Sequence, residues 1–221
     1  MALVRLTVLT WNLFHGRALP PAGRNLFEEF AAALAGWEWD AALLQEVPPW
    51  WPPSLASRTG ADQRLVLTSR NSLLALRRAV AVRRPDLIKS NSGGCNAILV
   101  RECAIVEHRT HLLSRLPERR RVHGVRLDAG TWLANLHTGA DVEQGRLAAN
   151  AVLRWSAGAP SVLGGDFNVR DIELPGFTYA GGFGVDQVFA RGLSPDGQAQ
   201  VLDRGQLSDH APVAVHLDYA S

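Results

Sequence analysis

The sequence predicts a mixed α/β fold, formed by a single domain that spans residues 1–221. A strand, an amphipathic helix and a second strand follow one another near the N-terminus, and short runs rich in β-formers recur through the middle of the chain at hairpin spacing. The apolar fraction of 47% is ample for a buried core. No linker, low-complexity tract or internal repeat divides the chain, which favours one domain.

The N-terminal part forms the predicted strand, helix, strand unit. Residues 4–10 alternate in polarity and are rich in β-formers, which predicts a strand. Residues 25–37 carry apolar side chains at helical spacing, with Asn25 as the expected N-cap, so they predict an amphipathic helix that covers a sheet. The apolar run 41–44 predicts a strand buried on both faces. This unit brings to one edge of the sheet the polar residues that follow its two strands, Asn12 and Glu46.

A rigid aromatic loop is predicted directly after Glu46. Residues 47–53 contain Pro48, Pro49, Pro52 and Pro53 together with an adjacent pair of tryptophans, Trp50 and Trp51. The two rings either pack on the domain as a lid or contact the substrate, and the sequence leaves both interpretations open.

The remaining elements are mostly short strands, whose spacing predicts antiparallel pairing. Runs of β-like sequence cover residues 64–68, 72–76, 79–82, 96–101, 104–113 and 122–127. A strand over 131–135 and a helix over 142–155 lead to a buried strand that includes 162–164. A Gly-rich loop, a strand over 184–190 and a closing strand over 211–217 complete the chain.

The segment 161–168, Ser-Val-Leu-Gly-Gly-Asp-Phe-Asn, is the clearest candidate for chemistry. Its first residues are typical of a strand end, and the two glycines let the backbone turn freely. Because an extended backbone points alternate side chains the same way, Asp166 and Asn168 face one pocket while Phe167 turns into the core. An isolated Gly-Asp-x-Asn is also typical of an Asx-turn, so the other strand ends decide between the two interpretations.

Polar residues stand at the ends of several predicted strands, where open α/β layers gather functional groups. They are Asn12, Glu46, Asn135, His137, Asp166, Asn168, Asp186, Asp209 and His210. Glu46, Asn12 and Asp209 supply oxygen ligands, which suit a hard cation such as Mg²⁺ and do not suit zinc. Taken singly, a histidine here is more often structural and Asp209 a turn or cap residue; together the set indicates metal-assisted phosphoester hydrolysis.

These segments, in this order, resemble the endonuclease/exonuclease/phosphatase superfamily. The matching blocks are Thr10-Trp11-Asn12, Leu44-Gln45-Glu46, Gly94-Cys95-Asn96-Ala97-Ile98-Leu99, Asn135-Leu136-His137, Gly165-Asp166-Phe167-Asn168, Val185-Asp186 and Ser208-Asp209-His210. The resemblance implies a four-layer α/β sandwich of two mixed β-sheets packed face to face with helices outside. It also implies that Glu46 is the principal Mg²⁺ ligand, helped by Asn12 and Asp209, with Mn²⁺ as a substitute ion.

The resemblance implies catalytic roles for five further residues. Asp166 would position and deprotonate the attacking water, and Asn168 and His210 would bind the scissile phosphate. Asp186 would support the His210 ring. His137 matches a histidine that some members use near the leaving group.

Nucleic acid is the expected substrate. The net charge is only +2, but every basic residue except Lys89 is arginine, and several bunch at Arg77, Arg78, Arg83 and Arg84 and at Arg119, Arg120 and Arg121. These bunches would flank a backbone-binding groove or protect a sheet edge by charge, and both interpretations stay open. A lipid or small-molecule phosphoester is the alternative substrate, and a catalytically silent binding module is the alternative class.

The sequence contains no predicted signal peptide or transmembrane segment. Residues 1–9 are too short and too interrupted by Arg5 for a signal peptide, and nowhere do 18 apolar residues run without a charge. We expect a cytoplasmic monomer without a transmembrane segment. Cys95 and Cys103 lack zinc-like spacing and are expected to be reduced core residues.

Overall fold

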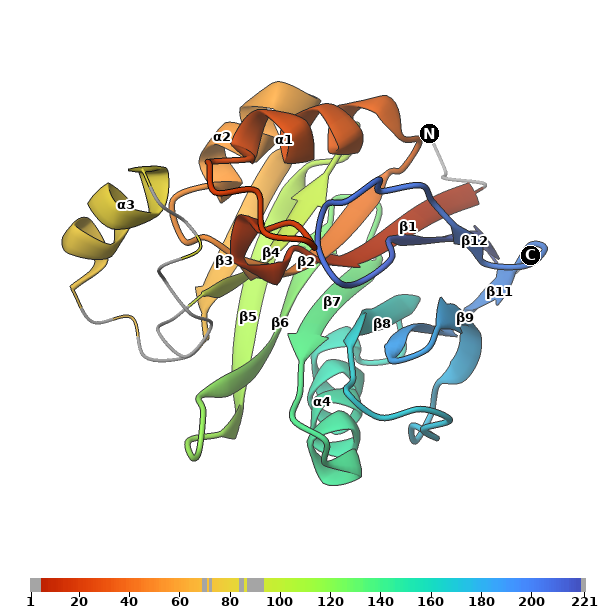
Figure 1. Ribbon diagram of the computed structural model, residues 1–221. Helices are drawn as coiled ribbons and strands as arrows, with labels where there is room; N and C mark the ends of the chain where they lie inside the picture. Colours follow the sequence, from red (N-terminus) through yellow and green to blue (C-terminus); the bar gives the residue numbers. More distant parts are fainter. Residues whose placement is uncertain (1–4, 69–70, 72, 84–85, 87–93, 220–221) are drawn as a thin grey trace.

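The protein folds as a four-layer α/β sandwich (Figure 1), as the computed structural model shows for residues 5–68, 71, 73–83, 86 and 94–219. Two mixed β-sheets pack face to face. Helices α1 (Phe27–Gly36) and α2 (Pro52–Thr59) cover the outer face of one sheet, and α4 (Val142–Ser156) covers the outer face of the other. The predicted fold class is therefore confirmed.

The first sheet is organised around a parallel pair. Strands β1 (Arg5–Asn12) and β2 (Ala41–Val47) run parallel and are joined through α1. The sheet order is β11 (Leu193–Pro195), β13 (Val213–Tyr219), β1, β2, β4 (Cys95–Val100) and β3 (Asp62–Leu67), and β12 (Gln200–Val201) also pairs with β13.

The second sheet repeats this plan. Strands β7 (Trp132–His137) and β8 (Ser161–Asp166) run parallel and are joined through α4. The sheet order is β5 (Ile105–Ser114), β6 (Arg120–Leu127), β7, β8, β10 (Asp186–Arg191) and β9 (Thr178–Phe183). Because parallel neighbours end at the same edge, each sheet presents two strand ends side by side.

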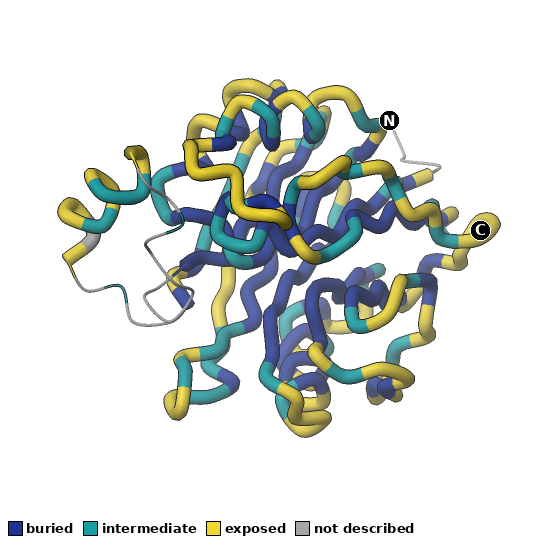
Figure 2. Tube along the Cα trace, in the orientation of Figure 1, coloured by how far each residue is buried: buried dark blue, intermediate teal, exposed yellow. Residues whose placement is uncertain are grey.

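Three apolar layers hold the sandwich together. The central strands β1, β2, β4, β7, β8 and β10 are buried along most of their length (Figure 2). Aliphatic side chains fill the space between the sheets, among them Val8, Leu43, Ile98, Leu133 and Val162. The layer under α1 and α2 adds four buried aromatic rings, Trp11, Phe30, Trp39 and Trp51, to its aliphatic side chains. Small residues of α4, such as Ala148 and Ala149, let that helix approach the second sheet closely.

Two predictions of secondary structure are wrong. Helix α3 (Leu74–Arg83) occupies the segment in which 72–76 and 79–82 were expected to be strands, and Ser72 lies outside the described residues. The segment consists mainly of leucine, alanine and arginine, which favour helix, and its two valines are too few to override them. Helix α2 begins at Pro52, inside the expected loop, because a proline at a helix start lacks only an N–H that would have no helical partner there.

Smaller differences concern strand and helix ends. Leu26, rather than Asn25, is the N-cap of α1, although Asn25 Oδ1 still accepts a hydrogen bond from the backbone N–H of Phe27 at 3.0 Å. The short strands β9, β11 and β12 lie in segments of the last third of the chain for which no strand was predicted.

The cysteines are both free, as expected. Cys95 is fully buried, and burial raises the pKa of its thiol. Cys103 is half-buried at the margin of the layer between the sheets. Among the described residues, no helix combines the length and the apolar character needed to cross a membrane.

Candidate active site

The ends of the two parallel pairs meet across the sandwich. Asn12 ends β1 in the first sheet, whereas His137 and Asp166 end β7 and β8 in the second. The Asn12 side-chain amide donates a hydrogen bond to Asp166 Oδ2 at 3.0 Å, while Asn12 Oδ1 accepts one from the backbone N–H of Phe14 at 2.9 Å. One carboxamide therefore joins the two sheets at the site.

Buried amides also join the sheets just beneath the site. Gln45 Nε2 donates to Asn135 Oδ1 at 2.8 Å, and Asn135 Nδ2 donates to the carbonyls of Leu44 and Ala97 at 2.9 and 2.8 Å. Gln45 and Asn135 are both fully buried. Buried polar groups of this kind are stable only when they are hydrogen-bonded, so these contacts fix how the two sheets face each other.

A β-bulge directs Glu46 toward the site. Along β2 the side chains alternate, so Leu43 packs between the sheets and Leu44 packs under α1 and α2. Gln45 again points between the sheets, and simple alternation would send Glu46 to the helix layer. The pairing with β4 shifts between Leu44 and Val47, and Glu46 has a left-handed φ of 49°, which re-aims its side chain.

Two histidines contact the Glu46 carboxylate. His15 Nε2 lies 3.0 Å from Glu46 Oε2, and His137 Nδ1 lies 3.9 Å from Glu46 Oε1. Burial opposes ionisation of Glu46, but the hydrogen bond and the electrostatic interaction with His15, followed by weaker electrostatic interactions with His137 and Arg120, outweigh it and lower the pKa of Glu46 to about 2. The carboxylate is therefore charged at neutral pH, and its side chain remains 20% exposed.

His15 is the site residue that the sequence did not identify. It follows β1 in a short 3-10 turn (Phe14–Gly16) and has a φ of 55°. Its ring approaches the chain at Gly94 so closely that a Cβ there would lie 3.1 Å from the ring. A histidine in an irregular loop has no periodicity to mark it, so the only available signal was its position three residues after Asn12.

Asp166 is the most enclosed carboxylate of the site, with 1% of its surface exposed. Its Oδ1 accepts the backbone N–H of Asn168 at 2.9 Å, and its Oδ2 lies 3.4 Å from His137 Nε2. Burial and the negative charge of Asp186 raise the pKa of Asp166 to about 6, against the opposing effects of His210 and Asn12. Burial, followed by the charge of Arg120, lowers the pKa of His137 to about 3, so that ring is neutral.

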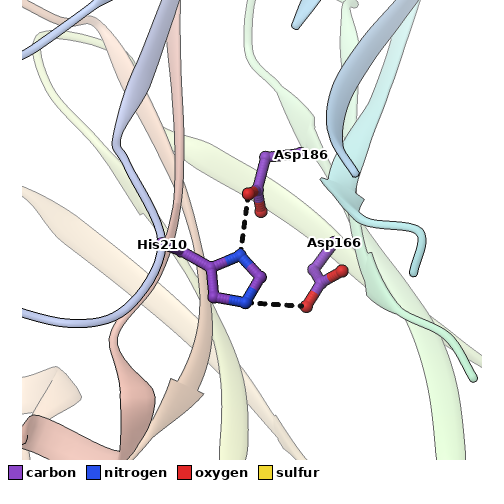
Figure 3. Close-up of side chains that lie close together, drawn as sticks. All are labelled: Asp166, Asp186 and His210. Carbon is purple, nitrogen blue, oxygen red and sulfur yellow. Dashed lines mark hydrogen bonds and ion pairs between the residues drawn. The ribbon is translucent and has the colours of Figure 1, made fainter. Parts of the chain in front are cut away.

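Asp186 holds the ring of His210, as Figure 3 shows. His210 Nδ1 lies 2.7 Å from Asp186 Oδ2, and the opposite nitrogen, Nε2, lies 3.9 Å from Asp166 Oδ2. Burial lowers the pKa of His210, but the hydrogen bond and the charge of Asp186, together with Asp166, raise it to about 9. Ligand atoms of Asp166, Asp186 and His210 all lie within 4.8 Å of one another, so this group could hold a metal ion.

The other two predicted residues differ in their surroundings. Asn168 has a φ of 51°, and its amide donates to the carbonyl of Thr138 at 2.9 Å, which fixes the side chain beside Asp166. Asp209 is exposed, and its side chain makes no hydrogen bond or ion pair with any described residue. All the predicted site residues except Asp209 thus belong to one chain of contacts: Glu46, His137, Asp166, Asn12, Asn168, His210 and Asp186.

A polar hollow of about 230 Å³ opens beside these groups. It is lined by His15, Glu46, Thr68, Glu118, Arg120, His137 and Asn168. Arg120 reaches it from the start of β6 and forms an ion pair with Glu118 at 2.6 Å. A negatively charged group in this hollow would lie near Arg120. The neighbouring Arg119 is exposed and does not line the hollow.

Two sheets that meet at a carboxylate and histidine site under a polar hollow define a phosphoesterase of the α/β sandwich class. Residues 9–210 match the sequence profile of the Endonuclease/Exonuclease/phosphatase family, and the chain belongs to this family. A search of curated protein sequences found no match. The resemblance inferred from the sequence motifs is therefore confirmed over nearly the whole chain.

Solved structures share the fold at low sequence identity. A mannosyl-6-phosphatase of Bacteroides thetaiotaomicron superposes with a TM-score of 0.72 at 17% identity, covering 97% of this chain and 100% of that one. An endonuclease/exonuclease/phosphatase of Beutenbergia cavernae has a TM-score of 0.69 at 20% identity, covering 97% and 72%. A humanized D. rerio TDP2 has a TM-score of 0.65 at 15% identity, covering 98% and 100%. At these identities the likeness shows the fold alone.

Proposed function

We propose that the chain is a Mg²⁺-dependent phosphodiesterase that hydrolyses nucleic acid, acting as a single domain over residues 1–221. The observation that carries the proposal is the placement of Asp166, whose Oδ2 lies 3.4 Å from His137 Nε2 and 3.9 Å from His210 Nε2. A carboxylate and two imidazoles around one point are the groups that in-line displacement at a phosphate requires for a base and for charge stabilisation.

A divalent metal is typical of the family, and the residues present fit one. Glu46 is ionised and partly exposed at the hollow, and Asn12 ends the neighbouring strand, so we assign the metal to Glu46 and Asn12, with Asp209 as a further ligand. Carboxylate and amide oxygens are the ligands that Mg²⁺ prefers, and Mn²⁺ accepts the same set. When bound, the ion would supply charge neutralisation at the phosphate.

Asp166, Asp186 and His210 are the second candidate metal group. Asp186 Oδ1 is buried and finds no hydrogen-bond partner among the described residues, which favours an ion there. The other oxygen of Asp186 lies 2.7 Å from His210 Nδ1, however, and this hydrogen-bond distance gives Asp186 a role as the partner of His210 without an ion. We therefore assign the metal to Glu46 and treat Asp186 as the residue that orients His210.

Asp166 is proposed as the general base. Hydrogen bonds from Asn12 and from the backbone of Asn168 hold its carboxylate, and burial raises its pKa to about 6. A base works best when its pKa lies near the operating pH, because it is then both ionised and able to accept a proton from water. Asp166 is thus suited to orient and deprotonate the attacking water.

His210 and His137 are proposed to contact the substrate from opposite sides of Asp166. With Nδ1 bonded to Asp186 and the pKa raised to about 9, His210 is protonated and can donate from Nε2 to a phosphate oxygen. The neutral ring of His137 lies between Glu46 and Asp166, which places it near the leaving group. Asn168 lines the hollow and completes the phosphate contacts.

Nucleic acid is proposed as the substrate because a cationic side chain, Arg120, is available at the catalytic hollow to contact a phosphate of the nucleic-acid backbone. Arg120 lines the hollow directly, and phosphate contacts of arginine dominate binding to a nucleic-acid backbone. The second candidate is a small-molecule or lipid phosphoester, and the solved mannosyl-6-phosphatase of the same fold is the observation that favours it. A silent binding module would have no need for the whole chain of contacts from Glu46 to Asp186.

The test is a side-by-side assay in Mg²⁺ of plasmid DNA, single-stranded RNA, mannose 6-phosphate and a phosphatidyl substrate, with EDTA as the control. Hydrolysis of a nucleic acid that exceeds the others supports the proposal, and preferential release of phosphate from mannose 6-phosphate would replace it. Arg120→Ala should also reduce the salt slope of DNA binding by on the order of one unit, whereas Arg119→Ala serves as the matched control. Folded protein that turns over none of these esters with any divalent ion would favour the binding module.

A further inference from the structure

A second hollow lies beside the active site and differs from it in chemistry. Its volume is about 250 Å³. Four apolar residues line it, Phe27, Trp50, Trp51 and Val82, together with four polar or charged ones, Asn25, Glu28, Ser54 and Arg78. Sites that hold a whole drug-sized ligand usually measure about 300 to 1,000 Å³. This one suits a single ring rather than a complete ligand.

Trp51 forms a fixed floor for this hollow. Its ring is buried and lies against Phe27 and Phe30, with ring centroids 5.3 and 5.5 Å apart. It also passes over Gly16 so closely that a Cβ on that residue would lie 2.4 Å from the ring. The floor therefore does not rearrange when a ligand enters.

Trp50 is the ring that remains available. It is half-buried, and among the described residues its indole N–H has no hydrogen bond and its ring stacks on no other ring. Buried or half-buried indoles usually have a partner for their N–H. Trp50 therefore presents both an aromatic face and a free donor to the hollow.

Helix α3 forms the facing wall. Arg78 and Val82 are four residues apart, which places them one above the other on the same face of that helix. Arg78 is exposed and makes no ion pair or hydrogen bond with any described residue, so its charge is not neutralised from within the protein. Proteins that bind single-stranded nucleic acid combine positive charge, which contacts the phosphates, with aromatic rings on which the bases stack.

The hollow lies near the active site, and His15 stands between the two. A narrow gap lined by His15, Gly16, Asn25, Trp50 and Val82 adjoins it, and His15 also lines the catalytic hollow, where it contacts Glu46. The gap measures only about 10 Å³, room for about one water molecule, so a substrate whose scissile phosphate lies at Glu46 would reach Trp50 by extending past His15 along the surface. A nucleic-acid strand, which continues beyond its scissile phosphate, can extend in this way.

We propose that this hollow is a subsite for one base of a single-stranded nucleic acid, a specificity element that rests on the proposed function. The base stacks on Trp50, the amide of Asn25 donates to a ring acceptor, and Arg78 contacts a neighbouring phosphate. The side-chain oxygen of Asn25 accepts the backbone N–H of Phe27, which orients the amide and leaves its N–H donors available.

Binding without turnover gives the direct test. In EDTA, wild-type protein is titrated with oligo(dT) of about eight nucleotides, with oligo(rU) of the same length, and with the abasic form of the DNA strand. Both base-bearing strands should bind more tightly than the abasic strand. Trp50→Ala should weaken the base-bearing strands by roughly 5- to 150-fold and leave the abasic strand unchanged, because stacking on an aromatic ring requires a base. Trp50→Phe retains a ring and should recover most of the loss.

Charge is tested separately. Arg78→Ala should weaken all strands and flatten the salt dependence by on the order of one slope unit, whereas Arg154→Ala, an exposed arginine on α4 in the opposite outer layer, should change neither. Turnover of the abasic strand in Mg²⁺ should be the same in Trp50→Ala and wild type. Thymidine 5′-monophosphate should displace oligo(dT).

The results separate this subsite from the proposed function. Equal affinity of wild type for abasic and base-bearing strands, or wild-type affinity in Trp50→Ala, overturns the subsite even when hydrolysis is intact. Displacement of the strand by mannose 6-phosphate but not by thymidine 5′-monophosphate overturns it in favour of a sugar. Discrimination between the strands by a protein that hydrolyses no phosphoester supports the subsite and removes the proposed function instead.

Discussion

Replacing Asp166 by asparagine should separate catalysis from stability, because the same burial that suits this carboxylate to its role also destabilises the folded protein. The substitution preserves size and removes the base. General base catalysis contributes about 10² to 10⁴ in rate, so kcat should fall by at least that factor. Binding of the substrate should persist, so the change in KM should be small.

The effect of Asp166→Asn on stability follows from the pKa of the carboxyl. Burial and Asp186 raise that pKa from 3.8 to about 6. A folded-state pKa above the unfolded value means that the folded protein binds the proton more tightly, so stability falls as the pH rises through this interval and the full cost is present at pH 7. Two pKa units correspond to about 3 kcal/mol.

Asparagine at this position removes that cost but introduces a smaller one. Two N–H donors, from Asn12 and from the backbone of Asn168, point at the carboxylate. An amide can accept from only one of them, and the second buried donor then costs about 1 to 3 kcal/mol. The metal-free variant should therefore have a free energy of unfolding equal to wild type or up to about 2 kcal/mol higher at pH 7.

Two measurements check this reasoning: steady-state hydrolysis in saturating Mg²⁺, and urea unfolding in EDTA. A folded Asp166→Asn protein that hydrolyses a phosphodiester at near the wild-type rate would refute the role of Asp166 as base. If the free energy of unfolding of Asp166→Asn were several kcal/mol lower than that of wild type, the claim that the buried Asp166 carboxylate destabilises the folded protein would be refuted. His210→Ala provides a contrast, because it should lower the rate and also leave Asp186 buried without its partner.

Further predictions concern the metal, acid stability and the backbone. Glu46→Gln should weaken Mg²⁺ binding in calorimetry by at least tenfold and Asp186→Asn should not, because the metal is assigned to Glu46; the reverse order would move the metal to Asp186. Burial lowers the pKa of His123 well below its ordinary value. Below about pH 6.5 the unfolded chain therefore binds a proton that folded His123 does not, and the free energy of unfolding falls by up to about 1.4 kcal/mol per pH unit. His123→Leu should reduce this pH dependence in urea unfolding between about pH 7 and 5. Gly165 has a φ of 141°, and a Cβ there would lie 2.1 Å from the carbonyl oxygen of Leu136. Gly165→Ala should therefore lower the free energy of unfolding by more than about 3 kcal/mol, as measured in a thermal melt. Gly36→Ala is the control and should be nearly neutral, because a Cβ at Gly36 would contact nothing.

Much of the fold follows from local patterns in the sequence. Strand β1 was predictable from its alternating pattern and its β-forming residues, and β2 and β8 because burial on both faces requires continuous apolar runs. Helices α1 and α4 were predictable because one apolar face repeats at helical spacing. α3 was not predictable in this way, because its apolar residues form no clear face and several remain exposed, among them Leu76 and Val82. Only the propensity of the individual residues favoured the helix.

The candidate site could be predicted as far as it depends on strand ends. The meeting of Asn12 with Asp166 follows from two strands that end at one edge of the sandwich. The approach of His15 to Glu46 does not follow, because it depends on a left-handed turn and on a bulge, and neither has a distinctive sequence signal here. Trp51 packs in the core, whereas Trp50 is half-buried at a hollow, so the packing role holds for Trp51 and substrate contact stays a proposal for Trp50.

The buried amides beneath the site have a consequence for how this protein can diverge. Asn135 and Gln45 bond the two sheets to each other, so the spacing of Glu46 from Asp166 depends on strands and not on the loops around them. Displacements of about 1 Å are enough to cost a large factor in rate, and directional bonds resist such sliding where apolar contact alone would not. Insertions or deletions in the surrounding loops can therefore alter the substrate while the reactive groups keep their positions. A lineage carrying this core is free to exchange one phosphoester for another without rebuilding its chemistry.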